Sequence, residues 1–126
     1  MTRTLAAAAA AVAILASPAG AAPPATRGPF VGAVRQGDTR TYRFSDVPPG
    51  GLCPNPMTWH LVSLSNQPTT DRLTLTAAGV SATGAGGGAQ VAIYGNWCTS
   101  FDISVTGTSV ATAAVFTISV RQTDTV

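Results

Sequence analysis

Lysine and glutamate are both absent from this 126-residue chain, histidine occurs once, and cysteine occurs twice. Lysine and glutamate are good helix formers, so their absence argues against a helical bundle. The seven arginines and five aspartates give a formal net charge of +2, a small surplus rather than a basic patch. Binding to nucleic acid needs clustered positive charge, so we do not expect nucleic acid as a partner.

The N-terminal segment has the order of a secretory signal peptide. Arg3 is followed by an apolar run from Leu5 to Ala16 and then by small residues up to Ala22. The run covers 12 residues, too few to cross about 30 Å of hydrocarbon as a helix. We therefore predict that residues 1–22 are a signal peptide cleaved after Ala21 or Ala22. The mature chain is expected to be secreted into the extracellular space, without a membrane partner.

Composition divides the remaining chain into a lead-in, one domain and a tail. Residues 23–29 are rich in proline, which lacks the backbone donor that ordered structure needs, and they predict an extended, poorly ordered lead-in. Residues 30–122 are expected to form a single domain, and residues 123–126 a short tail. A domain of this size buries about two-thirds of its unfolded surface, enough for one core.

Period-two alternation in the domain predicts short strands. Runs of Val, Thr, Ile and aromatic residues are separated by Gly, Pro, Asn and Asp, as is typical of strands joined by tight connections. An antiparallel β-sandwich is the expected fold, because the apolar face of each strand must be covered by a second layer. About seven strands are predicted, near residues 30–35, 39–46, 57–65, 72–77, 91–93, 101–105 and 116–121.

Two stretches within this pattern carry further predictions. Between residues 57 and 65 the apolar parity switches from Trp59 and Leu61 to Val62 and Leu64, which predicts a bulge or burial on both faces. The glycine-rich stretch 83–88 lacks the features of a phosphate-binding loop, so we expect a flexible hairpin connection there.

Cys53 and Cys98 are predicted to form one disulfide, because export places both in an oxidising compartment. Closing the loop between them would remove unfolded-chain entropy worth about 4 kcal/mol in the chain-entropy model. A zinc site and free or intermolecular thiols are the alternatives. Two cysteines and one histidine do not supply the four ligands of tetrahedral zinc, so a carboxylate would also be needed. Calcium bound by Asp38 and Asp46 is a further alternative, although no closely spaced acidic ladder is present. We expect no metal and no cofactor.

Catalytic chemistry has little support in the sequence. His60 is the single candidate for a general base near neutral pH, but it lies in a predicted strand, where histidine is typically structural. No nucleophile elbow of the Gly-x-Ser-x-Gly type occurs. The chain is therefore expected not to be an enzyme. The serines and aspartates that could be combined with His60 on paper are Ser63, Ser100, Asp71 and Asp102.

Trp59, Tyr94 and Trp97 are the candidate ligand-binding residues. Flat aromatic rings with a polar handle could form a platform for a sugar or a peptide. Both tryptophans lie near a cysteine in the sequence, so packing against the disulfide as core is the alternative. That alternative is favoured for Trp59 and is evenly balanced for Trp97, which follows an apparent turn at Gly95–Asn96.

Residues 37–44, with 101–105 and 115–120, resemble the bacterial pre-peptidase C-terminal domain. The resemblance implies a small secreted β-sandwich module of the kind that accompanies extracellular enzymes. Residues 90–94 stand where that family carries an aspartate-containing strand, without the aspartates.

The expected function is that of a secreted, non-enzymatic binding module. Its partner would be an extracellular protein or a polysaccharide, contacted through the segments 50–57 and 95–99. One alternative is a carbohydrate-binding module that uses the three aromatic residues. Another is an inhibitor of extracellular proteases that presents the rigid loop after Cys53, residues 54–57.

Overall fold

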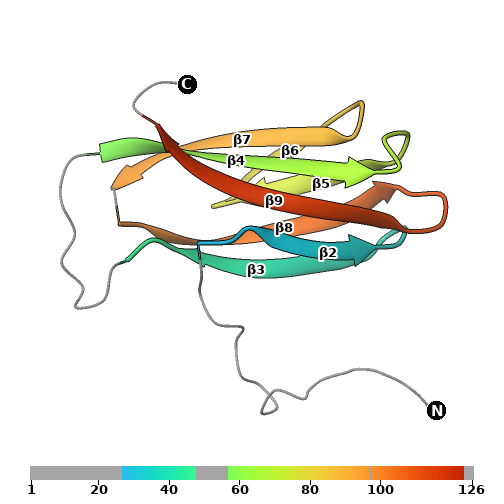
Figure 1. The fold of residues 1–126 in the computed structure, drawn as a ribbon, viewed down its shortest axis with the longest axis horizontal. Coiled ribbons are helices and arrows are strands. Elements are labelled where there is room, and N and C mark those ends of the chain that lie inside the picture. Colours follow the sequence, from blue (N-terminus) through green and yellow to red (C-terminus); the bar gives the residue numbers. More distant parts are fainter. Residues whose placement is uncertain (1–26, 48–56, 97, 124–126) are drawn as a thin grey trace, which may run out of the picture.

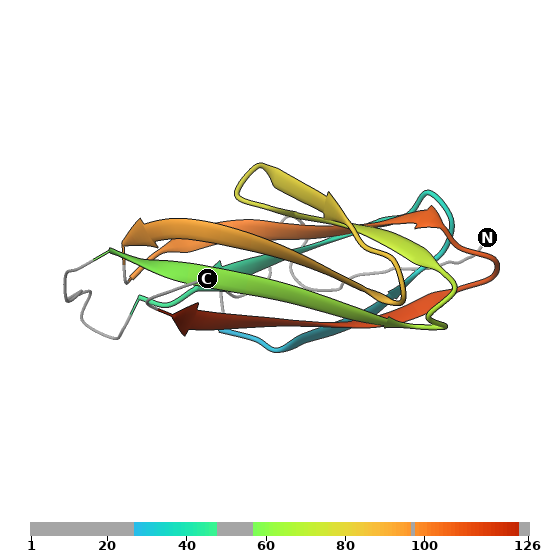
Figure 2. The ribbon, with the colours of Figure 1, turned by 90° about the horizontal axis from the view of Figure 1, so that it is seen from above.

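The computed structural model describes residues 27–47, 57–96 and 98–123, and this part of the chain is all β-structure. Two four-stranded antiparallel sheets lie face to face as in a β-sandwich (Figures 1 and 2). The first sheet has the strand order β2-β9-β4-β7 and the second has the order β3-β8-β5-β6. The strands are β2 (Phe30–Val34), β3 (Thr39–Ser45), β4 (Met57–Gln67), β5 (Arg72–Ala77), β6 (Val80–Thr83), β7 (Gly88–Asn96), β8 (Ser100–Ser109) and β9 (Ala114–Thr123).

The core lies between the two sheets and is filled by the alternate side chains of both. Val62 and Ile118 from the first sheet and Leu75, Ile103 and Val105 from the second are completely buried. Their positions follow the predicted alternation, because every second residue of a strand faces the same side. The expectation of an all-β fold with two apolar layers is confirmed.

Strand β4 corrects the prediction of a bulge. Its pairing with β7 continues without a shift from Met57 to Ser65, so no bulge interrupts it. The even-numbered residues of β4, such as Val62 and Leu64, face the core. Leu61 is buried although it belongs to the opposite, outward row. The second alternative, burial on both faces, therefore accounts for the parity switch.

Strand β6 is an eighth strand, one more than the seven expected. It pairs with β5 through a turn in which Ala78 and Gly79 both have positive φ, the conformation that suits tight hairpins. Among its four residues Ala82 packs against the core. Val80 and Ala82 alternate with Ser81 and Thr83, but four residues are too short a run for the strand to be found from the sequence.

The glycine-rich stretch does not close a hairpin, contrary to the prediction. Strand β6 before it belongs to the second sheet and β7 after it belongs to the first, so the stretch carries the chain between layers. Gly86 and Gly87 have positive φ, and a Cβ at Gly87 would lie 2.8 Å from the Thr69 side chain. The glycines permit a tight passage that bulkier residues would obstruct.

Tyr42 fills the gap between strands β2 and β3, which occupy neighbouring edges of the two sheets. Its ring packs beside Phe30 and edge-on to Phe116. A Cβ at Gly32 would lie 2.3 Å from the Tyr42 hydroxyl, so only glycine leaves room for the ring. Burial raises the pKa of the Tyr42 phenol, and the nearby Arg40 opposes this in part.

Candidate ligand-binding face

Two of the three predicted aromatic residues, Trp59 and Tyr94, lie side by side. Trp59 on β4 and Tyr94 on β7 are directly opposite each other in the antiparallel register. Their ring centroids are 5.0 Å apart and the ring planes are inclined by 55°. The third residue, Trp97, lies outside the described residues. The structure thus forms a cross-strand aromatic pair from residues 35 positions apart.

This pair faces away from the core. On β4 the flanking residues Thr58 and His60 are buried toward the core, so alternation directs Trp59 outward. Trp59 is partly exposed, and Tyr94 has 55% of its surface accessible to solvent. Packing of Trp59 as core, the alternative favoured from the sequence, is wrong because Trp59 falls on the outward parity of its strand.

Apolar side chains extend the pair into a patch on the outer face of the first sheet. We call Met57, Trp59, Leu61, Ala92 and Tyr94 the aromatic patch. Leu61 lies opposite Ala92, and exposed Met57 stands two residues before Trp59. A large exposed apolar side chain beside two outward rings is a feature of binding surfaces, whereas single exposed apolar residues are ordinary.

Polar groups stand at the margin of the patch. On the neighbouring strand β9, Thr123 lies opposite Trp59 and Arg121 lies opposite Leu61. The Trp59 indole N–H, the Tyr94 hydroxyl and the Arg121 guanidinium have no hydrogen-bond or ion-pair partner among the described residues. Aromatic side chains whose N–H or O–H groups lack partners can bind a ligand that has both apolar and hydrogen-bonding surface.

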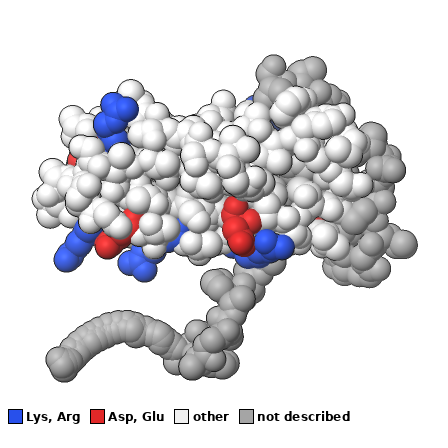
Figure 3. Space-filling view, turned by 180° about the vertical axis from the view of Figure 1, so that it is seen from behind, with Lys and Arg blue, Asp and Glu red and all other residues white. Residues whose placement is uncertain are grey.

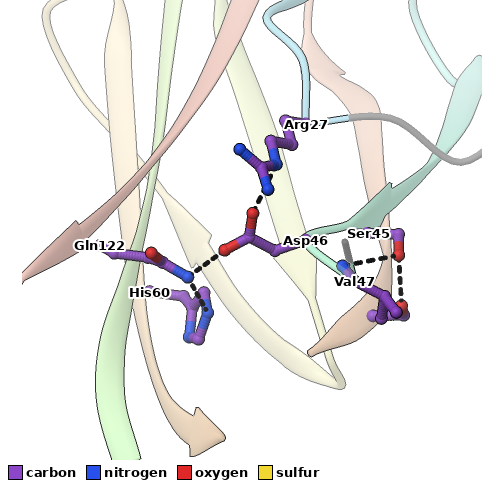
Figure 4. A network of polar contacts seen from close by, with 7 residues as sticks. Arg27, Ser45, Asp46, Val47, His60 and Gln122 are labelled. Atoms are coloured by element: carbon purple, nitrogen blue, oxygen red, sulfur yellow. Dashed lines mark hydrogen bonds and ion pairs between the residues drawn. The ribbon is translucent and has the colours of Figure 1, made fainter. Parts of the chain in front are cut away.

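His60 lies inside the sandwich rather than at a surface. It has no solvent exposure, and its ring meets those of Phe44 and Phe101 edge-on. A chain of polar contacts links it outward (Figure 4): the Gln122 side-chain amide donates to Asp46 and lies 3.2 Å from His60 Nε2, and Arg27 lies 2.5 Å from Asp46. His60 is thus a buried, hydrogen-bonded structural residue, as its position in a strand predicts.

Among the described residues, His60 has one polar contact through its ring. Its Nε2 lies 3.2 Å from the Gln122 side-chain nitrogen, and which atom donates depends on the histidine tautomer. His60 Nδ1 has no partner among the described residues. Because the residue has no solvent exposure, its ring is not open to a substrate.

The serines and aspartates that could accompany His60 are engaged elsewhere. Ser63 accepts from Gln90, Ser100 bonds to Ser45, and Asp102 forms an ion pair with Arg43. Asp71 Oδ1 accepts from the Ala111 backbone N–H. Among the described residues, none of these four hydrogen-bonds to His60, so no catalytic triad is assembled there.

Asp38 and Asp46, the residues considered for calcium, do not converge. Asp38 accepts from the backbone N–H of Arg35 in the β2–β3 turn, whereas buried Asp46 contacts Arg27 and Gln122. Over the described ranges, no three His, Cys, Asp or Glu side chains are grouped in a way that could hold a metal ion.

The remaining sequence predictions fall mainly outside the described residues. These include the signal peptide, Cys53 and residues 50–56 of the predicted contact segment 50–57 and inhibitory loop 54–57. Met57, the last residue of both, is the first residue of β4. Cys98 is described, and its backbone N–H donates to Asn96 Oδ1 at 3.1 Å. Gly95 and Asn96, expected to form a turn, are instead the last two residues of β7. The pairing of Cys53 with Cys98 stays a prediction.

Comparison of the chain with protein-family models, with curated proteins and with solved structures finds no match. The resemblance to pre-peptidase C-terminal domains therefore stays a sequence-based prediction. Within residues 27–47, 57–96 and 98–123, no helix has the length and apolar character needed to span a bilayer.

Arg121 and Leu61 were not identified as candidates from the sequence, whereas Met57 belonged to the predicted contact segment 50–57. The signal was nevertheless present, because Trp59 and Leu61 share one parity on β4 and Arg121 lies in the predicted strand 116–121, on the opposite parity to Phe116 and Ile118. What the sequence could not supply is the register, which places β9 beside β4 and so brings Arg121 next to the rings.

Proposed function

We propose that the chain is a secreted, non-enzymatic β-sandwich module that binds extracellular polysaccharide through Trp59 and Tyr94. In this proposal the signal peptide, residues 1–22, is removed on export, and a disulfide between Cys53 and Cys98 stabilises the end of the sandwich near the aromatic patch. The single observation that carries the binding function is the outward cross-strand pair of aromatic rings.

A sugar ring suits this arrangement for chemical reasons. Pyranose rings have apolar C–H faces that stack on aromatic side chains, and hydroxyl groups around their edges that need hydrogen-bond partners. The patch offers both kinds of contact, since Trp59 and Tyr94 provide ring faces together with an indole N–H and a phenol hydroxyl. Because the two rings are inclined by 55°, they suit a chain that twists between successive sugars better than a flat crystalline surface.

Low charge on the molecule is consistent with this class of ligand. The face shown in Figure 3 is mostly uncharged, with a few blue and red groups, several of which lie side by side. Arg27 and Arg43 are paired with Asp46 and Asp102, so these charges contribute little to the long-range field of the molecule. Contact chemistry, rather than long-range attraction, would therefore determine what binds.

Affinity electrophoresis and tryptophan fluorescence test the proposal. The mature protein is run through gels that contain soluble β-glucan or polygalacturonate, and it is titrated with the same polymers in solution. We expect retardation by at least one polymer. Trp59→Ala and Tyr94→Ala should each weaken binding roughly tenfold or more, as expected for aromatic anchors at a binding surface.

The matched control is Val80→Ala, which shortens an exposed apolar side chain on β6 of the other sheet. This variant should bind like the wild type. The proposal would be wrong if no polysaccharide retarded the protein or altered its fluorescence. It would also be wrong if the Trp59 and Tyr94 variants, folded as judged by circular dichroism, bound as tightly as the control.

A further inference from the structure

Resting on this proposed function, we infer that the bound polysaccharide is acidic, and that Arg121 pairs with the carboxylate of a uronic acid next to the aromatic rings. The inference concerns the class of ligand rather than the existence of the site. It depends on the charge, the position and the free state of one side chain.

Arg121 is the only arginine or aspartate in the strands of the first sheet, β2, β9, β4 and β7. The one other basic residue in those strands is His60, which is buried on the inner side. Over the described strands, the outer face of this sheet is therefore neutral except for one guanidinium. A single positive charge on an otherwise neutral aromatic surface selects for one negative group on the ligand.

The register places that charge within reach of the rings. Arg121 lies opposite Leu61, and Trp59 is two residues from Leu61 on the same face of β4. Arg121 and Trp59 are therefore diagonal neighbours, a separation of about 7–8 Å between Cα atoms that long side chains span. The Arg121 guanidinium could therefore reach the substituents of a sugar stacked on the Trp59–Tyr94 pair.

Arg121 also has no acidic partner among the described residues. Two other arginines of the described chain form ion pairs, Arg27 with Asp46 and Arg43 with Asp102, whereas exposed Arg121 has neither an ion pair nor a hydrogen bond with any described residue. The planar guanidinium matches the geometry of a carboxylate and binds it through two parallel hydrogen bonds. It is thus available for a carboxylate supplied by a ligand.

Other anionic partners fit this surface less well. A nucleic acid would also stack on the rings, but its non-specific affinity for proteins comes mainly from several phosphate contacts, and the described strands of this face supply one cation. An acidic peptide would supply carboxylates without the rigid apolar rings that match two adjacent aromatic side chains. In a polyuronate bound as proposed, the stacked sugar supplies most of the contact, and the guanidinium pairs with the carboxylate of that sugar alone.

The experiment compares two forms of one polymer. Polygalacturonate and its fully methyl-esterified form share a backbone, but esterification removes the charge from each carboxylate. Binding of both is measured by titration at low ionic strength. We expect the wild type to bind the acidic form roughly tenfold more tightly, a preference that shrinks as added salt screens the pair.

The decisive variant is Arg121→Gln, and its control is Arg72→Gln, which removes an exposed arginine from β5 of the other sheet. Arg121→Gln should bind the two forms almost equally, and Arg72→Gln should keep the wild-type preference. Thermal unfolding of each variant checks that the fold is retained. A preference that survives in Arg121→Gln would overturn the inference.

Further outcomes separate this inference from the proposed function. If the wild type binds both forms equally, or binds neutral β-glucan through Trp59 but neither form of the pectic polymer, the acidic ligand is wrong and the polysaccharide function stands. If an oligoaspartate peptide binds more tightly than polygalacturonate, the ligand class is wrong. If no polysaccharide binds at all, the proposed function and this inference both fail.

Discussion

The two outer faces of the sandwich share one alternating pattern but differ in what their side chains do. On the second sheet, two complete rows of hydroxyl residues run across all four strands. In the register one row is Thr39, Thr106, Thr74 and Thr83, and the other is Thr41, Ser104, Thr76 and Ser81.

These hydroxyls bond largely to one another. Thr39 with Thr106, Thr41 with Ser104, and Thr76 with Ser81 are joined by side-chain hydrogen bonds of 2.8, 3.1 and 2.8 Å. The charged pair Arg43 and Asp102 continues the same pattern.

On the first sheet, by contrast, Trp59, Tyr94 and Arg121 have polar groups without partners among the described residues. The comparison shows that the hydroxyl face is largely satisfied internally, whereas the aromatic face has polar groups without partners among the described residues, as the proposed binding function requires.

The largest effect on the free energy of unfolding should come from the core between the two sheets. Ile118→Ala removes a completely buried side chain of β9 and should lower the free energy of unfolding by about 2–5 kcal/mol, from lost apolar burial and the cavity left behind. Val115→Ala, at an exposed position of the same strand, should change it by less than about 0.5 kcal/mol. Urea unfolding measures both. Equal losses would mean that β9 does not have one inward and one outward side.

A smaller effect on the free energy of unfolding should distinguish the two outer faces, when a threonine hydroxyl is removed from each. Thr74 Oγ1 lies 2.7 Å from Thr83 Oγ1 and 2.5 Å from Thr108 Oγ1, so Thr74→Val removes hydrogen bonds with little change of shape. We expect it to lower the free energy of unfolding by about 0.5–1.5 kcal/mol.

The matched substitution is Thr117→Val on the first sheet, where the hydroxyl has no partner among the described residues. It should leave the free energy of unfolding within about 0.5 kcal/mol of the wild type. Chemical denaturation of both variants provides the measurement. If Thr117→Val cost as much as Thr74→Val, the contrast between a satisfied face and an open one would be lost.

The smallest effect concerns the two tyrosines, since Tyr42 is held between the sheets and Tyr94 faces outward. Burial raises the pKa of Tyr42, with Arg40 opposing the shift, so the unfolded chain ionises at this residue before the folded protein does. Its contribution to stability is therefore complete below the ordinary tyrosine pKa of about 10 and is lost as the pH rises toward the folded-state pKa.

Denaturant unfolding at pH 9 and pH 11 measures this loss. The wild type should lose more stability between the two pH values than Tyr42→Phe, which cannot ionise there. Identical losses in the two proteins would show that the Tyr42 phenol is as solvated in the folded state as in the unfolded chain.

Much of the fold was predictable because alternation reports directly on burial. Phe101, Ile103 and Val105 on β8, and Phe116 and Ile118 on β9, are buried as their spacing predicts. Strand β6 was missed because its alternating run is only four residues long, and the glycine-rich connection was misassigned because local sequence does not say which layer the next strand joins.

The candidate site was predictable in part. Trp59 and Tyr94 stood out by residue type, but their contact depends on β4 pairing with β7, which single-strand patterns do not fix. The same holds for Arg121: its strand was identified from the sequence, but the pairing of that strand with β4 was not. Side-chain character is a local property of the sequence, whereas a binding surface is defined by which strands become neighbours.

The pairing of β2 with β9 joins the first described strand to the last, and β9 then separates β2 from β4 in the sheet. Except for β5 and β6, any two strands that are neighbours in a sheet have other strands between them in the sequence. Proteins dominated by such distant contacts fold slowly, because each contact must first close a long loop. A ribosome-bound chain in which β9 has not yet been made would have no place for β2, so assembly of this sheet waits until β9 has left the ribosome.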